Sequence, residues 1–158
     1  MNAIPHRRHL PAASRARPAH GFTLIETMVT VGIAGVLSSI AYPSLESHAL
    51  RARRTDGLVV ILQAQLAEER FRANNASYAN LAEAGLHGVS AAGLYTVQIA
   101  SHTADGYVIL ASAIGAQARD AGCRHLRLTL TDATLSYASG ADATAANDAA
   151  ANRKCWGR

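Results

Sequence analysis

The sequence is short of charged and aromatic residues, and it lacks the spacings that mark common enzyme sites. Charged residues make up 16% and aromatic residues 5% of its 158 residues. It holds no HExxH, CxxC, GxSxG, Walker or calcium-loop spacing, and its histidines are widely scattered. Hydrophobic residues, at 49%, suffice for one folded core and an apolar segment besides. We therefore predict a single non-enzymatic domain with no catalytic residue, no metal site and no cofactor.

Acidic residues are absent from residues 1–21, although four of the basic residues lie there. The whole chain has 15 basic and 11 acidic residues, a formal net charge of +4. Without those four arginines the remainder carries 11 basic and 11 acidic residues, so its net charge is zero. Basicity is thus a targeting feature of the first segment, and DNA binding would need a local patch elsewhere. The four are Arg7, Arg8, Arg15 and Arg17.

Charge is nearly absent from residues 22–41 as well, a run of twenty residues in which Glu26 is the single charge. As a helix, this run is long enough to cross about 30 Å of hydrocarbon, so it predicts a transmembrane helix. A secretory signal peptide is the alternative, but its apolar stretch usually has about 7 to 15 residues and ends at a small-residue site. Here the small residue, Gly21, precedes the run. Cleavage after Gly21 would remove the leader, which stays cytoplasmic by the positive-inside rule, and would keep the anchor.

Glu26 is the anomaly of this span, because an ionisable group inside an apolar segment costs at least a few kcal/mol unless it is paired. Cleavage after Gly21 would create a positively charged amine on Phe22. In a bundle of identical segments, that amine on one chain could pair with Glu26 of its neighbour. The alternative is a glutamate that reaches the cytoplasmic interface of the membrane.

A second helical stretch follows the span. The helix of the span is weakened by Gly32, Gly35 and Pro43, so we expect a kink or a locally melted stretch near Pro43. Helical spacing resumes at Ser44 and stops near Asn74. Apolar residues fall on more than one side of this helix, which suits a helix with a sheet on one side and sister helices on the other. One side carries Leu58, Ile61, Leu62 and Leu66, and another carries Val60 and Phe71.

The remainder predicts a sheet, so the fold class is α+β: a long N-terminal helix packed on four antiparallel strands. Residues 76–93 have the composition of a loop. A period of two then marks the first and third of four strands joined in sequence, the second is apolar enough for a central strand, and the fourth follows a short turn. Asp105-Gly106 is a turn signal between the first two strands. We expect residues 139–152, rich in Ala, Asn, Asp and Gly, to form a loop that is poorly ordered unless it is tied down. The expected strands are residues 94–100, 106–114, 124–130 and 133–138.

Only two cysteines occur, Cys123 and Cys155, and they permit one intramolecular pairing. A disulfide would close a loop of about thirty residues and needs an oxidising compartment, such as the periplasm or the cell exterior. Two free buried thiols are the alternative.

The front of the chain resembles the class III signal of type IV pilins. The resemblance is carried by Gly21-Phe22-Thr23-Leu24-Ile25-Glu26, the apolar run after it and Pro43. It implies that a prepilin peptidase cuts after Gly21 and methylates Phe22, and that Glu26 aids docking with other pilin subunits in a helical filament. The chain would then lie in the inner membrane before assembly and in an extracellular pilus afterwards. The leader of 21 residues is long for the family, and Thr27 and Thr30 stand where apolar residues are more usual.

The rest of the chain resembles the PilE-type minor pilins. The resemblance implies a low-abundance subunit needed for pilus assembly and twitching motility, and a disulfide that bounds a variable surface loop. It also implies a leader at 1–21, a membrane and filament-core helix at 22–43 and a periplasmic pilin domain at 44–158. The matching segments are Arg54-Thr55-Asp56-Gly57, Glu69-Arg70-Phe71, Leu94-Tyr95, Arg119-Asp120-Ala121-Gly122-Cys123 and Cys155-Trp156.

A basic cluster surrounds the two cysteines and keeps DNA binding open as an alternative function. Trp156 would either stack on a base or pack at the disulfide, while Asp120 and other acids in the same stretch oppose DNA binding. That alternative is a DNA-receptor pilin in natural transformation. A pseudopilin of a type II secretion system is a further alternative, because pseudopilins share the front end of the chain. Arg51, Arg53 and Arg54, further forward, are expected to be solvated or at an interface. The cluster consists of Arg119, Arg124, Arg127, Arg153, Lys154 and Arg158.

Overall fold

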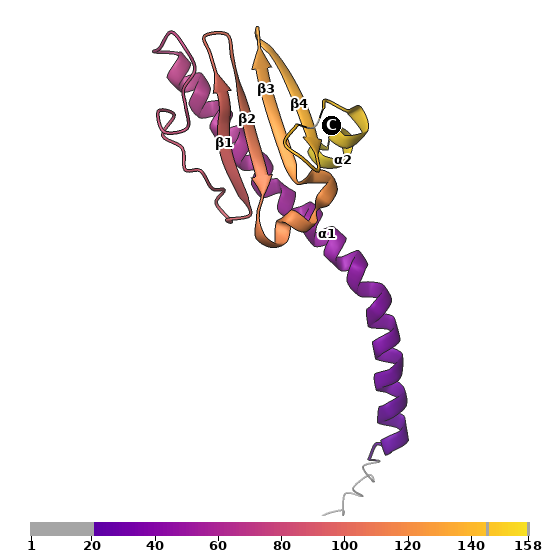
Figure 1. Cartoon of the computed structure of the whole chain (residues 1–158). Helices are drawn as coiled ribbons and strands as arrows, with labels where there is room; N and C mark the ends of the chain where they lie inside the picture. Colours follow the sequence, from indigo (N-terminus) through magenta and orange to yellow (C-terminus); the bar gives the residue numbers. More distant parts are fainter. Residues whose placement is uncertain (1–20, 145, 158) are drawn as a thin grey trace, which may run out of the picture. The chain divides into compact units, whose positions relative to one another are not determined.

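A computed structural model describes residues 21–144 and 146–157 of the chain. The leader arginines and Arg158 therefore lie outside the described residues. The chain divides into two compact units that meet between Ser39 and Ile40, and each is considered by itself. In order, the elements are α1 (Leu24–Arg72), β1 (Tyr95–His102), β2 (Gly106–Ala113), the short 3-10 helices η1 (Gly115–Arg119) and η2 (Ala121–Cys123), β3 (His125–Thr131), β4 (Thr134–Gly140) and α2 (Ala149–Trp156), as Figure 1 shows.

The first unit contains the start of α1. The Thr23 hydroxyl accepts a hydrogen bond from the Glu26 backbone N–H at 3.2 Å, so Thr23 caps the helix where it begins. The hydroxyls of Thr27 and Thr30 donate to backbone carbonyls of the same helix at 2.8 and 2.9 Å. Ser38 and Ser39 do the same, each at 2.7 Å. Polar side chains that are satisfied inside their own helix can lie in an apolar medium, so these residues are compatible with a membrane span.

α1 is helical without interruption from Leu24 to Arg72, with Pro43 inside it. The locally melted stretch that we expected near Pro43 is therefore wrong. A proline removes one backbone donor from the helix, and the turns on either side of Pro43 continue the helix around that loss. A kink at Pro43 stays a prediction.

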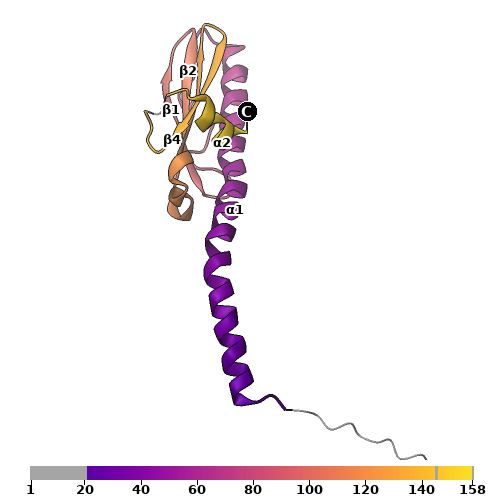
Figure 2. The same cartoon turned by 90° about the vertical axis from the view of Figure 1, so that its right-hand side faces the viewer.

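The second unit is a four-stranded antiparallel sheet in the order β1-β2-β3-β4, with the α1 segment of this unit on one face (Figure 2). Ile61, Val60 and Ala64 of α1 pack against inward side chains of the strands, among them Tyr95 and Leu128. The expected α+β fold and all four strands are confirmed, with ends that differ by at most two residues. The period of two identified β3, where buried and less buried residues alternate, whereas the central strand β2 is buried along nearly its whole length, as its apolar sequence indicated.

The α1 face in the core differs from the expected one. Leu62 and Leu66 were placed with Ile61, but they are 53% and 56% exposed, while Val60 from the opposite group is buried. The sheet covers one sector of the helix, centred on Gly57, Ile61 and Ala64, and leaves its next sector uncovered. The exposed Leu62 and Leu66 form the second apolar face that we expected on this helix.

The expected loop at 139–152 is also corrected. β4 runs on to Gly140, and α2 begins at Ala149. The Asp148 side chain accepts a hydrogen bond from the Ala151 N–H at 2.7 Å, and Gly157 ends the helix with a φ of 72°. An Asp before the first turn and a Gly after the last are the usual start and stop signals of a helix. The prediction of a loop used only the composition of the segment and so missed Asp148 and Gly157.

Candidate functional site

The segment around Gly21 and Phe22 is the first candidate site. Gly21, Phe22 and Thr23 precede the helix and are exposed, so the bond between Gly21 and Phe22 lies in non-helical backbone. Glu26 lies in the first turn of α1 and is exposed. Within the described residues, no side chain pairs with its carboxylate. Every side chain from Phe22 to Ser39 is exposed, and α1 is the one described helix long and apolar enough to cross a membrane.

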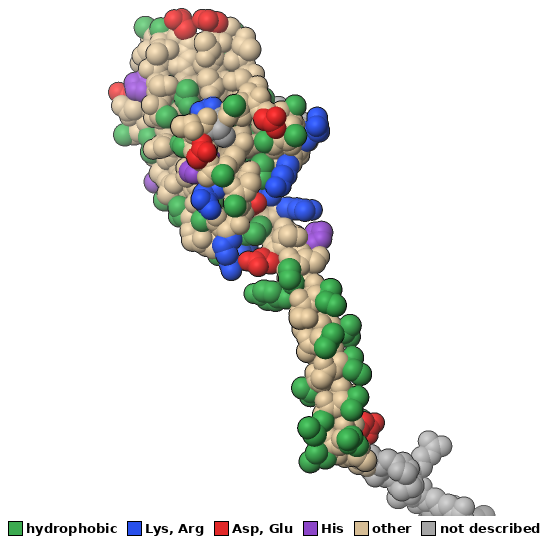
Figure 3. All heavy atoms as spheres, turned by 45° about the vertical axis from the view of Figure 1, so that its right-hand side comes forward, with side chains coloured by type: hydrophobic (Ala, Val, Ile, Leu, Met, Phe, Trp, Pro, Cys, Tyr) green, Lys and Arg blue, Asp and Glu red, His purple; other side chains and the backbone are tan. Residues whose placement is uncertain are grey.

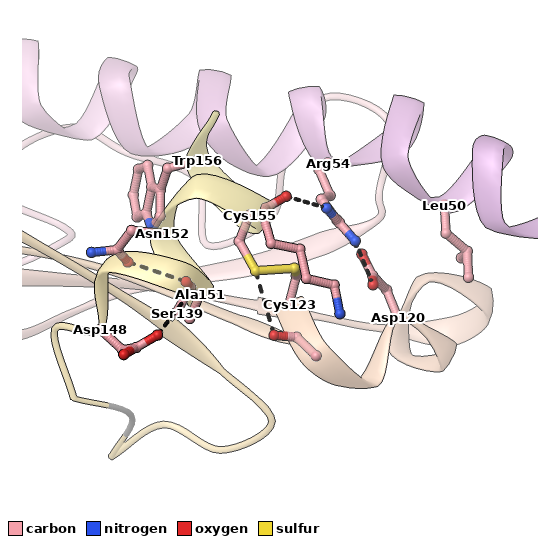
Figure 4. Close-up of a disulfide and its surroundings, with 12 residues drawn as sticks. Leu50, Arg54, Asp120, Cys123, Ser139, Asp148, Ala151, Asn152, Cys155 and Trp156 are labelled. Atoms are coloured by element: carbon pink, nitrogen blue, oxygen red, sulfur yellow. Dashed lines mark hydrogen bonds and ion pairs between the residues drawn. A yellow bond between two sulfur atoms is a disulfide. The ribbon is translucent and has the colours of Figure 1, made fainter. Parts of the chain in front are cut away.

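The second candidate site is built on the disulfide between Cys123 and Cys155, which the structure confirms with a Cα–Cα distance of 5.5 Å. It joins η2, just before β3, to the last turn of α2 (Figure 4). Both cysteines are buried, and they belong to the same core as Ile61 and Leu126. The alternative of two free thiols is thereby excluded.

Arg54 of α1 lies beside this disulfide, and its placement corrects an expectation. It was expected to be solvated or at an interface, but it is only 7% exposed. Its Nε pairs with Asp120 Oδ2, and its Nη2 donates to Asp120 Oδ1 at 2.8 Å. Its Nη1 donates to the Lys154 carbonyl oxygen at 2.6 Å (Figure 4). The planar fork satisfies both groups at once, which makes burial of the charge tolerable.

Gln117 of η1 extends this buried polar network to β1. Its Nε2 donates to the Leu50 carbonyl oxygen at 3.1 Å and to the Tyr95 hydroxyl at 3.2 Å. Burial raises the pKa of Tyr95, and its hydrogen bond with Gln117 partly opposes that rise. The network fixes η1 and η2 against α1. No sequence pattern pointed to Gln117 or to the pair of Arg54 with Asp120, because 66 residues separate the two partners.

The predicted basic cluster is only partly brought together. The side chain of Lys154 extends from α2 to η2. Its Nζ lies over Gly122, where a Cβ added to the glycine would be 2.7 Å away. Arg124 follows η2 directly and donates through Nε to the Ala118 carbonyl oxygen at 3.1 Å. Arg153, like Lys154, is exposed on α2. The disulfide joins η2 to the last turn of α2, so Arg124, which follows η2, and Arg153 and Lys154 of α2 lie on the two segments that flank it.

Arg127 lies elsewhere. Its neighbours in β3, Leu126 and Leu128, point into the core, so Arg127 is on the outer face of the sheet. Its Nη1 donates to the Ala143 carbonyl oxygen at 3.2 Å and so holds the loop after β4. Arg119 forms an ion pair with Glu46 at 3.1 Å. Figure 3 shows Lys and Arg side chains over the middle and lower part of the second unit, with acidic side chains among them and further acidic side chains at its upper end.

Trp156 packs against the protein. Its Nε1 donates to the Ala138 carbonyl oxygen at 3.2 Å, and its ring meets the edge of Tyr137 at a centroid distance of 5.1 Å. Beside it, Leu58 and Leu62 of α1 line a small apolar hollow. Of the two roles considered for Trp156, packing is the one that the structure supports.

Comparison with known proteins gives two family matches. Residues 43–127 match the family described as "Type IV minor pilin ComP, DNA uptake sequence receptor". Residues 16–42 match the prokaryotic N-terminal methylation motif. The chain is also similar to the type II secretion system core protein G of Pectobacterium carotovorum subsp. carotovorum, with 31% identity over 88 residues. That similarity covers 56% of each protein, so the chain spans little more than half the length of this relative.

Proposed function

The chain belongs to the family described as type IV minor pilin ComP, DNA uptake sequence receptor, and on this premise we propose that it is a minor pilus subunit cleaved between Gly21 and Phe22. A prepilin peptidase would cut there and methylate Phe22. The product stays in the inner membrane, with its C-terminal part periplasmic, until it joins an extracellular filament. We propose further that the pilus supports twitching motility.

The observation that carries this proposal is the exposed apolar surface of α1. Such a surface is unstable in water and needs either lipid or sister helices around it. Both environments suit it, which is what a subunit that moves from membrane to filament requires. The exposed apolar residues of this surface are Phe22, just before the helix, and, within it, Leu24, Ile25, Met28, Val29, Val31, Ile33, Val36, Leu37, Ile40, Tyr42 and Leu45.

Glu26 supplies the polar part of the assembly contact. The amine created on Phe22 lies four residues before Glu26, so an axial offset of about one helical turn between neighbouring chains would bring the amine of one beside the glutamate of the other. Pairing Glu26 with the amine of a neighbouring chain would offset the desolvation of both groups.

Gene deletion tests the assembly role. Loss of surface pili and of twitching on deletion, with recovery on complementation, is the expected result. The relative from Pectobacterium belongs to a secretion system, so exoprotein secretion is measured in the same strains. Loss of secretion with intact pili would favour the pseudopilin alternative.

A second function, DNA binding, is favoured by the basic residues of α2. The description of the matching family names a DNA uptake sequence receptor. Arg153 and Lys154 are exposed, and within residues 21–144 and 146–157 neither side chain forms an ion pair. Asp120, which seemed to oppose DNA binding, is buried and neutralised by Arg54. We therefore propose that Arg124, Arg153 and Lys154 form a DNA-binding face for duplex phosphates.

Retardation of a DNA duplex tests this second function. Binding should fall steeply as the salt concentration rises, because phosphate contacts release counterions. Replacement of Arg153 and Lys154 by glutamine should weaken it. Absence of retardation at low salt would contradict DNA binding and leave the filament role untouched.

A further inference from the structure

Arg54 connects the helix α1 to the proposed DNA-binding face, although it is buried. At 7% exposure its guanidinium has no room to meet a DNA phosphate. It nevertheless donates a hydrogen bond to the backbone carbonyl oxygen of Lys154, an exposed member of that face. Asp120 holds the guanidinium in the required orientation from the other side. Any effect of Arg54 on DNA must therefore pass through the position of Lys154.

Lys154 is fixed at two points along its length. Arg54 holds its carbonyl oxygen, and its Nζ lies over Gly122, in a space that a side chain at position 122 would fill. The next residue, Cys155, is tied to Cys123 by the disulfide. A single disulfide leaves a short helix free to pivot about the rotatable bonds of the two cysteines. The hydrogen bond from Arg54, one residue away, removes that freedom on the α1 side.

Contacts with β4 hold the opposite side of α2. Asn152 Nδ2 donates to the Tyr137 carbonyl oxygen at 3.0 Å, and Trp156 donates to Ala138. These bonds fix the part of α2 that faces the sheet. Among the described contacts, the bond from Arg54 is the one hydrogen bond from outside α2 that reaches Lys154.

We infer that Arg54 is a positioning residue of the DNA-binding face: it holds Lys154 in place for a phosphate contact and makes no contact with DNA itself. The inference rests on the proposed DNA binding. A preorganised side chain pays less entropy on binding, so loss of the Arg54 bond weakens DNA binding about three- to tenfold. The same cations still reach the phosphates in the complex, so the dependence on salt stays as it was.

The test uses the full chain in lipid nanodiscs, a short fluorescent DNA duplex and a series of salt concentrations. Arg54→Lys keeps a positive charge beside Asp120 and removes the fork that serves Asp120 and Lys154 together. Arg54→Gln is the more disruptive second variant. Asp56→Asn is the matched control, because Asp56 lies on the same helix and holds Ser90 and the Ala92 N–H instead of α2.

The expected result separates positioning from direct contact. Arg54→Lys binds the duplex about three- to tenfold more weakly with an unchanged salt slope, whereas Lys154→Gln lowers both the affinity and the slope, the latter by about 1. Asp56→Asn behaves as the wild type. In the Lys154→Gln background, Arg54→Lys has a much smaller effect than alone, because the two changes act on the same contact.

Hydrogen exchange of the α2 amides gives a readout that does not depend on DNA. These amides should exchange faster in both Arg54 variants and at the wild-type rate in Asp56→Asn. Unchanged exchange, or unchanged affinity of Arg54→Lys for the duplex while the wild type binds, would overturn the inference alone. Absence of binding by the wild type would overturn the DNA-binding function, and the inference with it.

Discussion

The ring of Tyr95 lies against the backbone of Gly57, so close that a Cβ at position 57 would be 3.0 Å from three of its carbon atoms. Because Gly57 has no side chain, the ring can pack directly against the backbone of α1, and Tyr95 is fully buried there. The Tyr95 hydroxyl is held by Gln117. The contact therefore sets how closely β1 can approach the helix.

Gly57→Ala should destabilise the protein by about 1 kcal/mol. Alanine gains about 1 kcal/mol in helix propensity, but overpacking a core typically costs about 1–3 kcal/mol, and the held ring cannot move aside. Urea unfolding of the two proteins measures the difference. Thr55→Ala, at an exposed position in the same turn, is the control and should be neutral or slightly stabilising. Greater stability in Gly57→Ala would show that the ring is not fixed.

Removal of the disulfide should free α2 while the sheet stays folded. The closed loop has a sequence separation of 32. For a loop of that size the chain-entropy estimate is about 3–4 kcal/mol of stability. Trp156 is the single tryptophan of the chain, so its fluorescence reports the state of α2 directly. We expect a red shift on reduction or in the double variant Cys123→Ser/Cys155→Ser. Unchanged emission would mean that the noncovalent contacts of α2 suffice.

Stability should fall as the pH rises through the range in which Glu68 titrates. Glu68 is fully buried; its Oε2 accepts the Ala79 N–H at 2.8 Å, and among the described residues its Oε1 has no partner. Burial raises the pKa of Glu68 above its usual 4.5. The folded state then holds the proton of Glu68 more tightly than the unfolded state, so the stability that this group contributes is lost from about pH 4.5 up to its raised pKa, and Glu68 adds no further change above that.

Glu68→Gln removes this titration. The variant should show a flatter dependence of unfolding free energy on pH, and its stability relative to the wild type should be greatest above the titration range. Unfolding by urea across a pH series measures both. Asp105→Asn, at an exposed carboxylate in the turn between β1 and β2, is the control that should keep the wild-type slope. Parallel curves for Glu68→Gln and the wild type would contradict the assignment.

Local alternation predicted the sheet well, whereas long-range partners escaped prediction. Leu126, Leu128 and Leu130 alternate with polar residues, and that alone fixes which face of β3 is buried. Local charge does not distinguish Arg54 from Arg51 and Arg53 as the buried residue, because its burial depends on Asp120, which is far away in sequence. The composition of residues 139–152 suggested a loop, but the N-cap at Asp148 favours a helix, and α2 begins directly after it. Helical periodicity found α1 but not which sector the sheet covers, since several sectors are apolar.

Glu26→Gln should leave the subunit in the membrane and keep it out of the filament. The neutral side chain is easier to insert, but it no longer offers a charge to the amine of a neighbouring chain. Sheared pili and membrane fractions probed for the subunit give the measurement. Glu46→Gln, at the first acidic residue after the span, is the matched control and should assemble. Normal amounts of Glu26→Gln in sheared pili would show that the carboxylate is not needed for assembly.

The identity of the first residue of the mature chain tests the central claim most directly. Mass spectrometry of the protein extracted from membranes should find an N-terminus at Phe22 with a methyl group on its amine. That result requires cleavage after Gly21 and retention of the apolar helix. An intact leader, or a chain that begins after Ala41, would contradict the account.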